Sequence, residues 1–147
     1  LYSSAASDVY KRQDFVEGTE LAVGVIDTGA GPGALPAVEI RPRSGHFGFE
    51  ERYVAGETDY FVPARLPKAV SAKAAKVAVD AHKALGLRHL SRVDMIVDAK
   101  GVPWFLEANV LPGLTETSLL PQAITASGST LGDVYFALAQ AALKGRG

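Results

Sequence analysis

Apolar residues occupy every second position in residues 19–28, where Leu21, Val23 and Val25 alternate with smaller or polar residues. This period of two is that of a β-strand with one buried face. A second strand is predicted at residues 35–41. Because the connection between the two is rich in glycine and proline, an antiparallel hairpin is expected.

A helical period replaces the alternation at residues 71–85, where apolar residues recur every three or four positions. Ser71 is expected to cap this helix and Gly86 to end it. The same period predicts a final helix at residues 130–144 and a shorter one at about 118–127. The C-terminal third of the chain is therefore expected to be mostly helical.

Two further strands are predicted at residues 90–97 and 102–110, joined by the turn at residues 98–101. Residues 42–56 follow no clear period and contain three aromatic residues, which favours an ordered functional loop. The order of elements predicts an α+β fold, with a mostly antiparallel sheet flanked by helices.

The composition is that of a globular domain of ordinary size, with 147 residues, 48% apolar and 21% charged. A net charge of −1 provides no electrostatic basis for binding nucleic acid. The apolar residues 131–143 are expected to face the core, because they are interrupted by Asp133 and Gln140 and are too few to span a bilayer. The absence of cysteine excludes disulfides and thiolate chemistry and is consistent with the cytoplasm.

The candidate chemistry lies on the predicted hairpin of residues 90–110. Arg92 and Asp94 are expected on one face of the first strand, and Phe105, Glu107 and Asn109 on one face of the second. The turn places Asp94 near Glu107. Two neighbouring carboxylates repel unless a cation lies between them, and an all-oxygen donor set suits Mg²⁺. An arginine adds a planar fork for phosphate, so the pattern predicts a metal–nucleotide site.

Each of these residues, taken alone, has a simpler interpretation. Arg92 and Asp94 fit a surface ion pair, and Glu20 fits an exposed strand carboxylate. Gly113 fits a plain turn after a proline, and Ser118 fits a helix N-cap as well as a ligand group. The combination, and not any single residue, favours the metal site.

The segments SRVDMIVDAKGVPW and FLEANVLPGLTETSLLP together resemble the C-terminal part of D-alanine–D-alanine ligases, which belong to the ATP-grasp superfamily. DFVEGTELAVGVID and FGFEERYVAGETDYFVPARL fit the same pattern. The resemblance implies that residues 14–147 are the C-terminal portion of an ATP-grasp domain. Residues 1–13 match no part of it and are expected to be a non-native leader, with a flexible native terminus as the alternative.

The resemblance implies ligation of two D-alanines through an acylphosphate, for peptidoglycan precursors in the cytoplasm. It implies ATP as co-substrate, two Mg²⁺ or Mn²⁺ ions, and a homodimer without nucleic-acid or membrane partners. The alternatives are another ATP-grasp carboxylate–amine ligase or a D-alanine–D-lactate ligase. For the chain by itself, a non-catalytic module that binds metal or nucleotide is a third alternative. The isolated chain is expected to be inactive, because the family's other phosphate-binding half is missing.

The resemblance also implies a role for the residues of the hairpin and of the loop that follows it. Asp94, Glu107 and Asn109 match the family's magnesium ligands. Arg92 matches the arginine that steadies the transferred phosphoryl group, and Gly113 matches a backbone N–H donor to the developing oxyanion.

Further matches concern the nucleotide and the second substrate. Ser118 and Leu119 match the residues that receive the carboxylate of the second D-alanine. Glu20 matches a carboxylate on the ATP ribose, and Arg52 stands where the family commonly has a phosphate-binding lysine. Tyr53 matches the tyrosine of a mobile loop over the site, which is typical of ligases that make dipeptide and not depsipeptide.

Overall fold

The computed structural model describes residues 13–42 and 58–144, and all structural statements below concern those residues. The leader expected at residues 1–13 lies outside this part of the chain except for Gln13. The loop expected at residues 42–56 lies outside it except for Pro42, and so do Arg52 and Tyr53.

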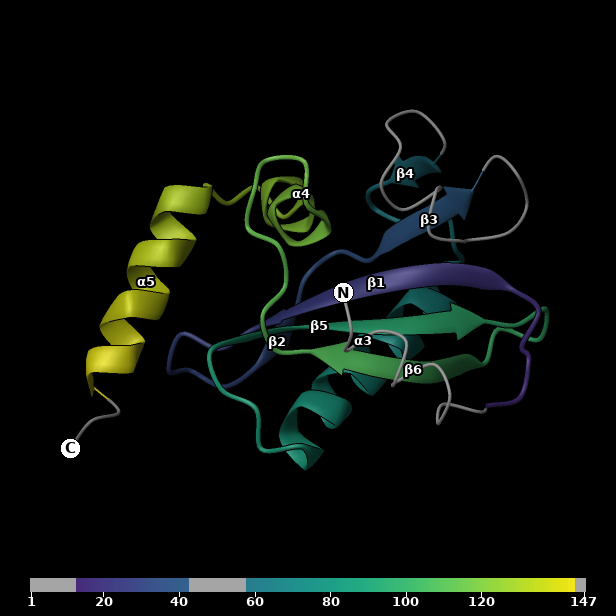
Figure 1. Cartoon of the computed structure of the whole chain (residues 1–147), viewed down its shortest axis with the longest axis horizontal. Helices are drawn as coiled ribbons and strands as arrows, with labels where there is room; N and C mark the ends of the chain where they lie inside the picture. The colour runs from purple at the N-terminus through teal and green to yellow at the C-terminus, as the bar shows by residue number, and fades with distance from the viewer. Residues whose placement is uncertain (1–12, 43–57, 145–147) are drawn as a thin grey trace, which may run out of the picture.

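An antiparallel sheet forms the centre of the molecule (Figure 1). Its order is β4-β3-β1-β5-β6, with the short β2 paired to β1. Neighbouring strands in this order are antiparallel throughout, which confirms the predicted α+β class. The strands are β1 (Thr19–Ile26), β2 (Gly33–Ala34), β3 (Val38–Pro42), β4 (Thr58–Phe61), β5 (Leu90–Val97) and β6 (Pro103–Asn109).

The helix α3 (Lys68–Ala84) covers one face of the sheet. It presents two small buried residues one turn apart, Ala74 and Ala78, so the helix approaches the strands closely. The side chains it covers are apolar and almost fully buried: Leu21, Val23, Val25, Val93, Met95 and Val97. This is the main hydrophobic core.

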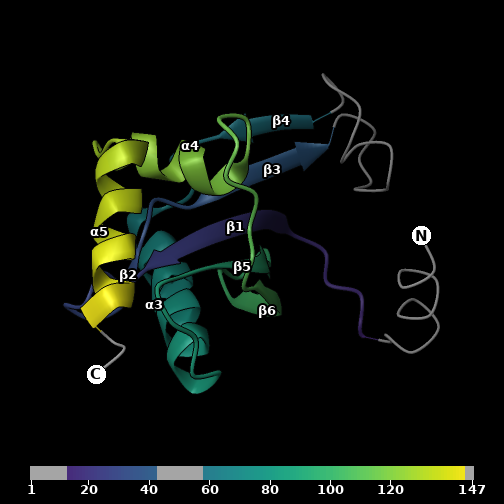
Figure 2. The same ribbon diagram turned by 60° about the vertical axis from the view of Figure 1, so that its left-hand side comes forward.

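The helix α4 (Leu119–Ala126) lies on the opposite face (Figure 2). It packs Ala123 against Ala22, Val38 and Ile40 of β1 and β3. The last helix, α5 (Leu131–Lys144), packs against α4 on the side away from the strands (Figure 1). Only the β1–β3 half of this second face is therefore covered.

Burial on both faces changes the character of β1. The predicted half-buried alternation is wrong, because every residue from Leu21 to Val25 is buried. Gly24 shows how closely α4 approaches: a Cβ atom built there would lie 2.5 Å from a methyl carbon of Leu120. Smaller residues on the second face leave room for a helix, whereas the sequence pattern resembled a solvent-facing side.

Other boundaries agree with the sequence or differ for local reasons. The strand at Leu90–Val97 and the hairpin of β1 with β3 are confirmed. Ser71 is not a cap, because α3 begins after Pro67, whose ring fixes a φ of −55° at the start of the helix. Gly86 follows the C-cap residue with a φ of +62°, a conformation that glycine adopts without strain.

The final helix matches its predicted range, but its apolar residues do not all face the core. Among its described side chains only Leu138 is buried, whereas Phe136 is 66% and Leu143 is 70% exposed. The covered side of α5 meets another helix and not the sheet. In the described ranges, no helix combines the length and apolar character needed to cross a membrane.

Candidate functional site

The β5–β6 hairpin brings the predicted residues together. Asp94 is the pairing partner of Glu107, and Arg92 is the partner of Asn109, as the sequence predicts. The register then shifts by one residue, so that Met95 pairs with Phe105. This is a β-bulge, and it places Phe105 on the side of Met95 and α3. The prediction that Phe105 shares a face with Glu107 is therefore wrong.

The turn of the hairpin is fixed by one carboxylate. Asp98 accepts hydrogen bonds from the backbone N–H groups of Lys100 and Val102, each at 2.9 Å, and from the Trp104 indole at 2.9 Å. The indole bond is the main cause of the lowered pKa of Asp98, and the two backbone bonds add to it. Gly101 completes the turn with a φ of +73°. The two strands that carry the site are thus joined by a turn with a defined shape.

Arg92 and Asp94 form a bidentate ion pair on the site face. Nε donates to Oδ1 at 2.8 Å and Nη2 donates to Oδ2 at 2.7 Å. Both side chains are partly buried, 21% and 15% exposed, so solvent screens the pair less than at an open surface. The hydrogen bonds to Asp94 raise the pKa of Arg92, against the opposing effect of burial, and Glu107 and Glu20 add favourable charge.

The oxygen donors suit a hard divalent cation. Asp94 and Glu107 face each other across the strand pair, and Asn109 follows on the same side. Its Oδ1 accepts the backbone N–H of Leu111 at 2.9 Å, which orients the amide. Within the described part of the chain no group of three or more His, Cys, Asp or Glu could hold a metal. Two carboxylates and an amide instead fit Mg²⁺, which completes its octahedron with water or phosphate oxygens.

The site face continues across β1 to Glu20. Glu20 pairs with Ile96 of β5, two positions along from the pair Ala22 and Asp94, and therefore lies on the same side of the sheet. It lines a cavity of about 660 Å³ at the end of β1 and β3, with Phe15 and Ile96 among the other lining residues. The arrangement can hold a large polar ligand beside the carboxylates.

A tight loop leads from β6 to α4 and carries the remaining predicted residues. A Cβ atom at Gly113 would lie 2.6 Å from the Ser118 hydroxyl oxygen, so only glycine fits there without a shift. Ser118 occupies the N-cap position of α4 but makes no capping hydrogen bond. Its hydroxyl lies 2.7 Å from that of Thr115 instead. Leu119 begins α4 and packs against the apolar cluster on β1 and β3.

The sequence gave no sign of a second ion pair beside the cavity. Glu39, 7% exposed, accepts from the backbone N–H of Arg65 at 3.0 Å and from its Nε at 3.1 Å. The guanidinium bonds lower the pKa of Glu39, although burial opposes them. The Arg65 guanidinium also stacks 3.4 Å from the centre of the Phe61 ring. Only an acidic residue flanked by Val38 and Ile40 hinted at this pair.

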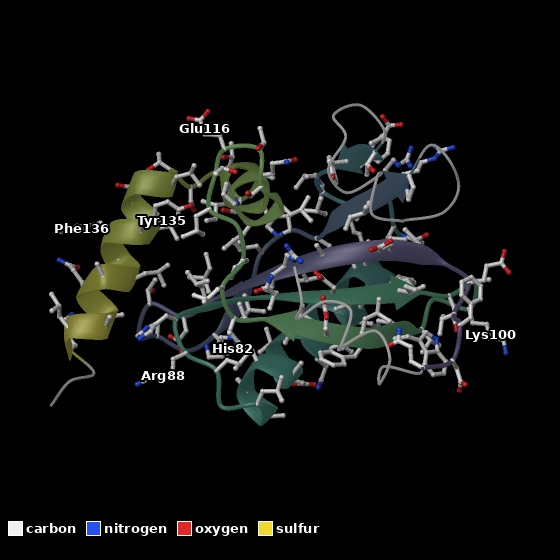
Figure 3. The ribbon with its side chains drawn as sticks, viewed as in Figure 1. His82, Arg88, Lys100, Glu116, Tyr135 and Phe136 are labelled. Carbon is white, nitrogen blue, oxygen red and sulfur yellow. The ribbon has the colours of Figure 1, made fainter. Side chains whose placement is uncertain are left out.

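A buried histidine lies on the α3 face, away from the carboxylates. His82 Nδ1 is 2.8 Å from the Ser91 hydroxyl, and His82 Nε2 is buried without a hydrogen-bond partner. Figure 3 shows the imidazole at the C-terminal end of α3. Burial lowers the pKa of His82, which favours the neutral ring. The pair links α3 to β5 and has no contact that relates it to the site.

Comparison with known proteins places these features in a family. The family model described as "D-ala D-ala ligase C-terminus" matches residues 12–139. A D-alanine–D-alanine ligase from Bordetella petrii is 43% identical over 135 residues, which are 90% of this chain and 41% of that protein.

Two solved structures have the same fold as this chain. The D-alanine–D-alanine ligase from Bacillus anthracis complexed with ATP aligns with a TM-score of 0.73 and 28% identity, over 91% of this chain and 41% of that one. The VanG D-Ala:D-Ser ligase from Enterococcus faecalis aligns with a TM-score of 0.72 and 27% identity, over 87% and 37%. The chain thus spans about two fifths of the length of the relatives it matches.

Proposed function

Because the chain belongs to the D-alanine–D-alanine ligase C-terminal family, we propose that it supplies one side of the active site of an ATP-dependent ligase that joins two D-alanines. The observation that carries this proposal is the pairing of Asp94 with Glu107, beside Arg92 and Asn109, on one face of the β5–β6 hairpin. Such a cluster of charged and amide groups on a sheet has no role in forming a core.

In this proposal Asp94, Glu107 and Asn109 hold two divalent ions, Mg²⁺ or Mn²⁺. When bound, the ions supply positive charge to the phosphoryl group being transferred. Arg92 binds an oxygen of that group: its guanidinium has five N–H donors, and the pair with Asp94 uses two of them. The ion pair also fixes the orientation of Asp94 in advance of ligand binding.

The other proposed roles concern the substrates. Glu20 binds the ATP ribose from the wall of the cavity of about 660 Å³, and the Gly113 backbone N–H donates to the developing oxyanion. The remaining roles belong to Arg52 on phosphate, Tyr53 over the site, and Ser118 with Leu119 at the carboxylate of the second D-alanine. Residues 1–13 remain a proposed leader, and the whole protein is proposed to be a cytoplasmic homodimer.

A joined enzyme tests this function. Residues 14–144 replace the aligned segment of the Bordetella petrii ligase, and D-alanyl-D-alanine is measured after incubation with ATP, Mg²⁺ and D-alanine. We expect dipeptide and phosphate in equal amounts. The 147-residue chain alone is expected to give none, because phosphoryl transfer needs charge neutralisation from both sides. The proposal fails if the joined enzyme is folded and binds ATP yet makes no dipeptide, or makes only a D-alanine–D-serine or depsipeptide product.

A further inference from the structure

Two side chains from α4 and α5 hold the loop at residues 113–118 from outside. Gln122 of α4 donates through Nε2 to the carbonyl of Thr117 at 2.8 Å. The hydroxyl of Tyr135 on α5 donates to the carbonyl of Leu114 in a long hydrogen bond of 3.4 Å. In Figure 3 Tyr135 lies on the side of α5 toward α4, whereas Phe136 lies on the far side. Neither contact is needed to bury the core.

The loop lacks the burial that would otherwise fix its shape. Residues 113–117 are exposed, between the buried Pro112 and the buried Leu120. Inside the loop, the Ser118 backbone N–H donates to the carbonyl of Thr115 at 2.8 Å. An exposed loop with few apolar contacts opens locally at small cost, so each hydrogen bond from a neighbouring helix restricts its conformations.

The two carbonyls bracket the residues that face the proposed acceptor. Leu114 directly follows Gly113, and Thr117 directly precedes Ser118. A backbone N–H and a hydroxyl that bind one substrate must keep a separation defined to within about 0.5 Å. Contacts at Leu114 and Thr117 control that separation without touching the substrate.

We propose that Gln122 and Tyr135 are positioning residues for the amino acid that accepts the acyl group. They act through the carbonyls of Thr117 and Leu114, which keep the Gly113 N–H and the Ser118 hydroxyl in register. The substrate role rests on the proposed function, whereas the bracing of the loop does not. The helices α4 and α5 thereby serve the site although they contribute no reacting group.

The first test uses the 147-residue chain and needs no activity. Amide hydrogen exchange is measured by NMR for wild type, Tyr135→Phe and Gln122→Met, with the Ser118 N–H as reporter. Each variant is expected to lower the protection of Ser118 about fivefold, which corresponds to one lost hydrogen bond. The Asp27 N–H, bonded to the His89 carbonyl at 2.7 Å, serves as the reference amide and is expected to stay unchanged. Protection of Ser118 that stays within twofold of wild type in both variants overturns the proposal.

The second test uses the joined enzyme and separates positioning from general stability. Both variants should raise the KM for D-alanine at the acceptor position about fivefold and leave the KM for ATP and the Tm unchanged. Phe136→Leu is the matched control, since Phe136 is adjacent to Tyr135 and 66% exposed. A lower Tm with both KM values unchanged overturns the proposal.

The two tests also separate this proposal from the function on which it rests. A joined enzyme with the wild-type segment that makes no dipeptide contradicts the proposed function. In that case the exchange of Ser118 alone decides whether Gln122 and Tyr135 brace the loop.

Discussion

The two faces of the sheet carry different residues for different purposes. The face under α3 is a continuous apolar surface, in which Leu21, Val93 and Met95 are fully buried. The opposite face is divided: α4 covers Ala22 and its neighbours, and the remainder carries charged and amide groups. One face therefore contributes most of the hydrophobic stabilisation, which leaves the other free to hold partly buried charge. Substitutions on the two faces are expected to separate folding from chemistry.

The largest expected effect is on the α3 face. Leu21→Ala removes a fully buried side chain and leaves a cavity, so the free energy of unfolding should fall by about 2–5 kcal/mol. Urea denaturation of the 147-residue chain measures this. Leu143→Ala makes the same chemical change at a position that is 70% exposed and should shift stability by less than about 0.5 kcal/mol. Equal losses for the two variants would contradict the assignment of the core.

The next effect is on the site face. Glu107→Gln keeps the volume of the side chain but removes one charge opposite Asp94, so the joined enzyme should lose activity by at least about 100-fold and require more Mg²⁺. The Tm should stay within a few degrees of wild type. Asp80→Asn removes an equal charge from the exposed i,i+4 pair with Lys76 on α3 and should leave activity unchanged. A Glu107→Gln enzyme with a normal rate and normal Mg²⁺ dependence would rule out the metal role.

The smallest effect tests a polar exception on the apolar face. Burial lowers the pKa of His82 in the folded chain, so the unfolded chain binds a proton more readily. Stability should therefore fall as pH decreases below about 6.5, the ordinary value for histidine, by no more than about 1.4 kcal/mol per pH unit. His82→Gln should weaken this dependence between pH 7 and 5.5, measured by urea denaturation at each pH. An unchanged dependence in the variant would assign it to other groups.

The hairpin could be predicted from the sequence because its signals are local. Alternation in Leu90–Val97 and a short turn at residues 98–101 define the strands and bring Asp94 opposite Glu107. The bulge could not be predicted, since nothing in the residues around Leu106 distinguishes it from a regular position. The four residues of β4 escaped notice because so short a strand carries too little pattern to detect.

Contacts between distant segments were also beyond the sequence. Glu39 and Arg65 are 26 residues apart, and no period relates them. The burial of β1 on both faces depends on where α4 packs, which its own sequence does not specify. Tyr135 resembled any aromatic residue of an amphipathic helix, although its hydroxyl reaches the carbonyl of Leu114. Residue types predicted the chemistry, whereas tertiary packing determined which side chains support it.

The bulge in β6 has a consequence for how the two ends of that strand depend on each other. In a regular strand, the turn at Asp98 would set the sidedness of every residue up to Asn109. The extra residue advances the alternation by half a period, so Trp104 follows the phase of the turn, whereas Glu107 and Asn109 follow the opposite one. Deleting Leu106 would restore a single phase and transfer either the aromatic residues or the carboxylate to the wrong side. The hairpin thus works as two short strands of opposite parity in one continuous segment.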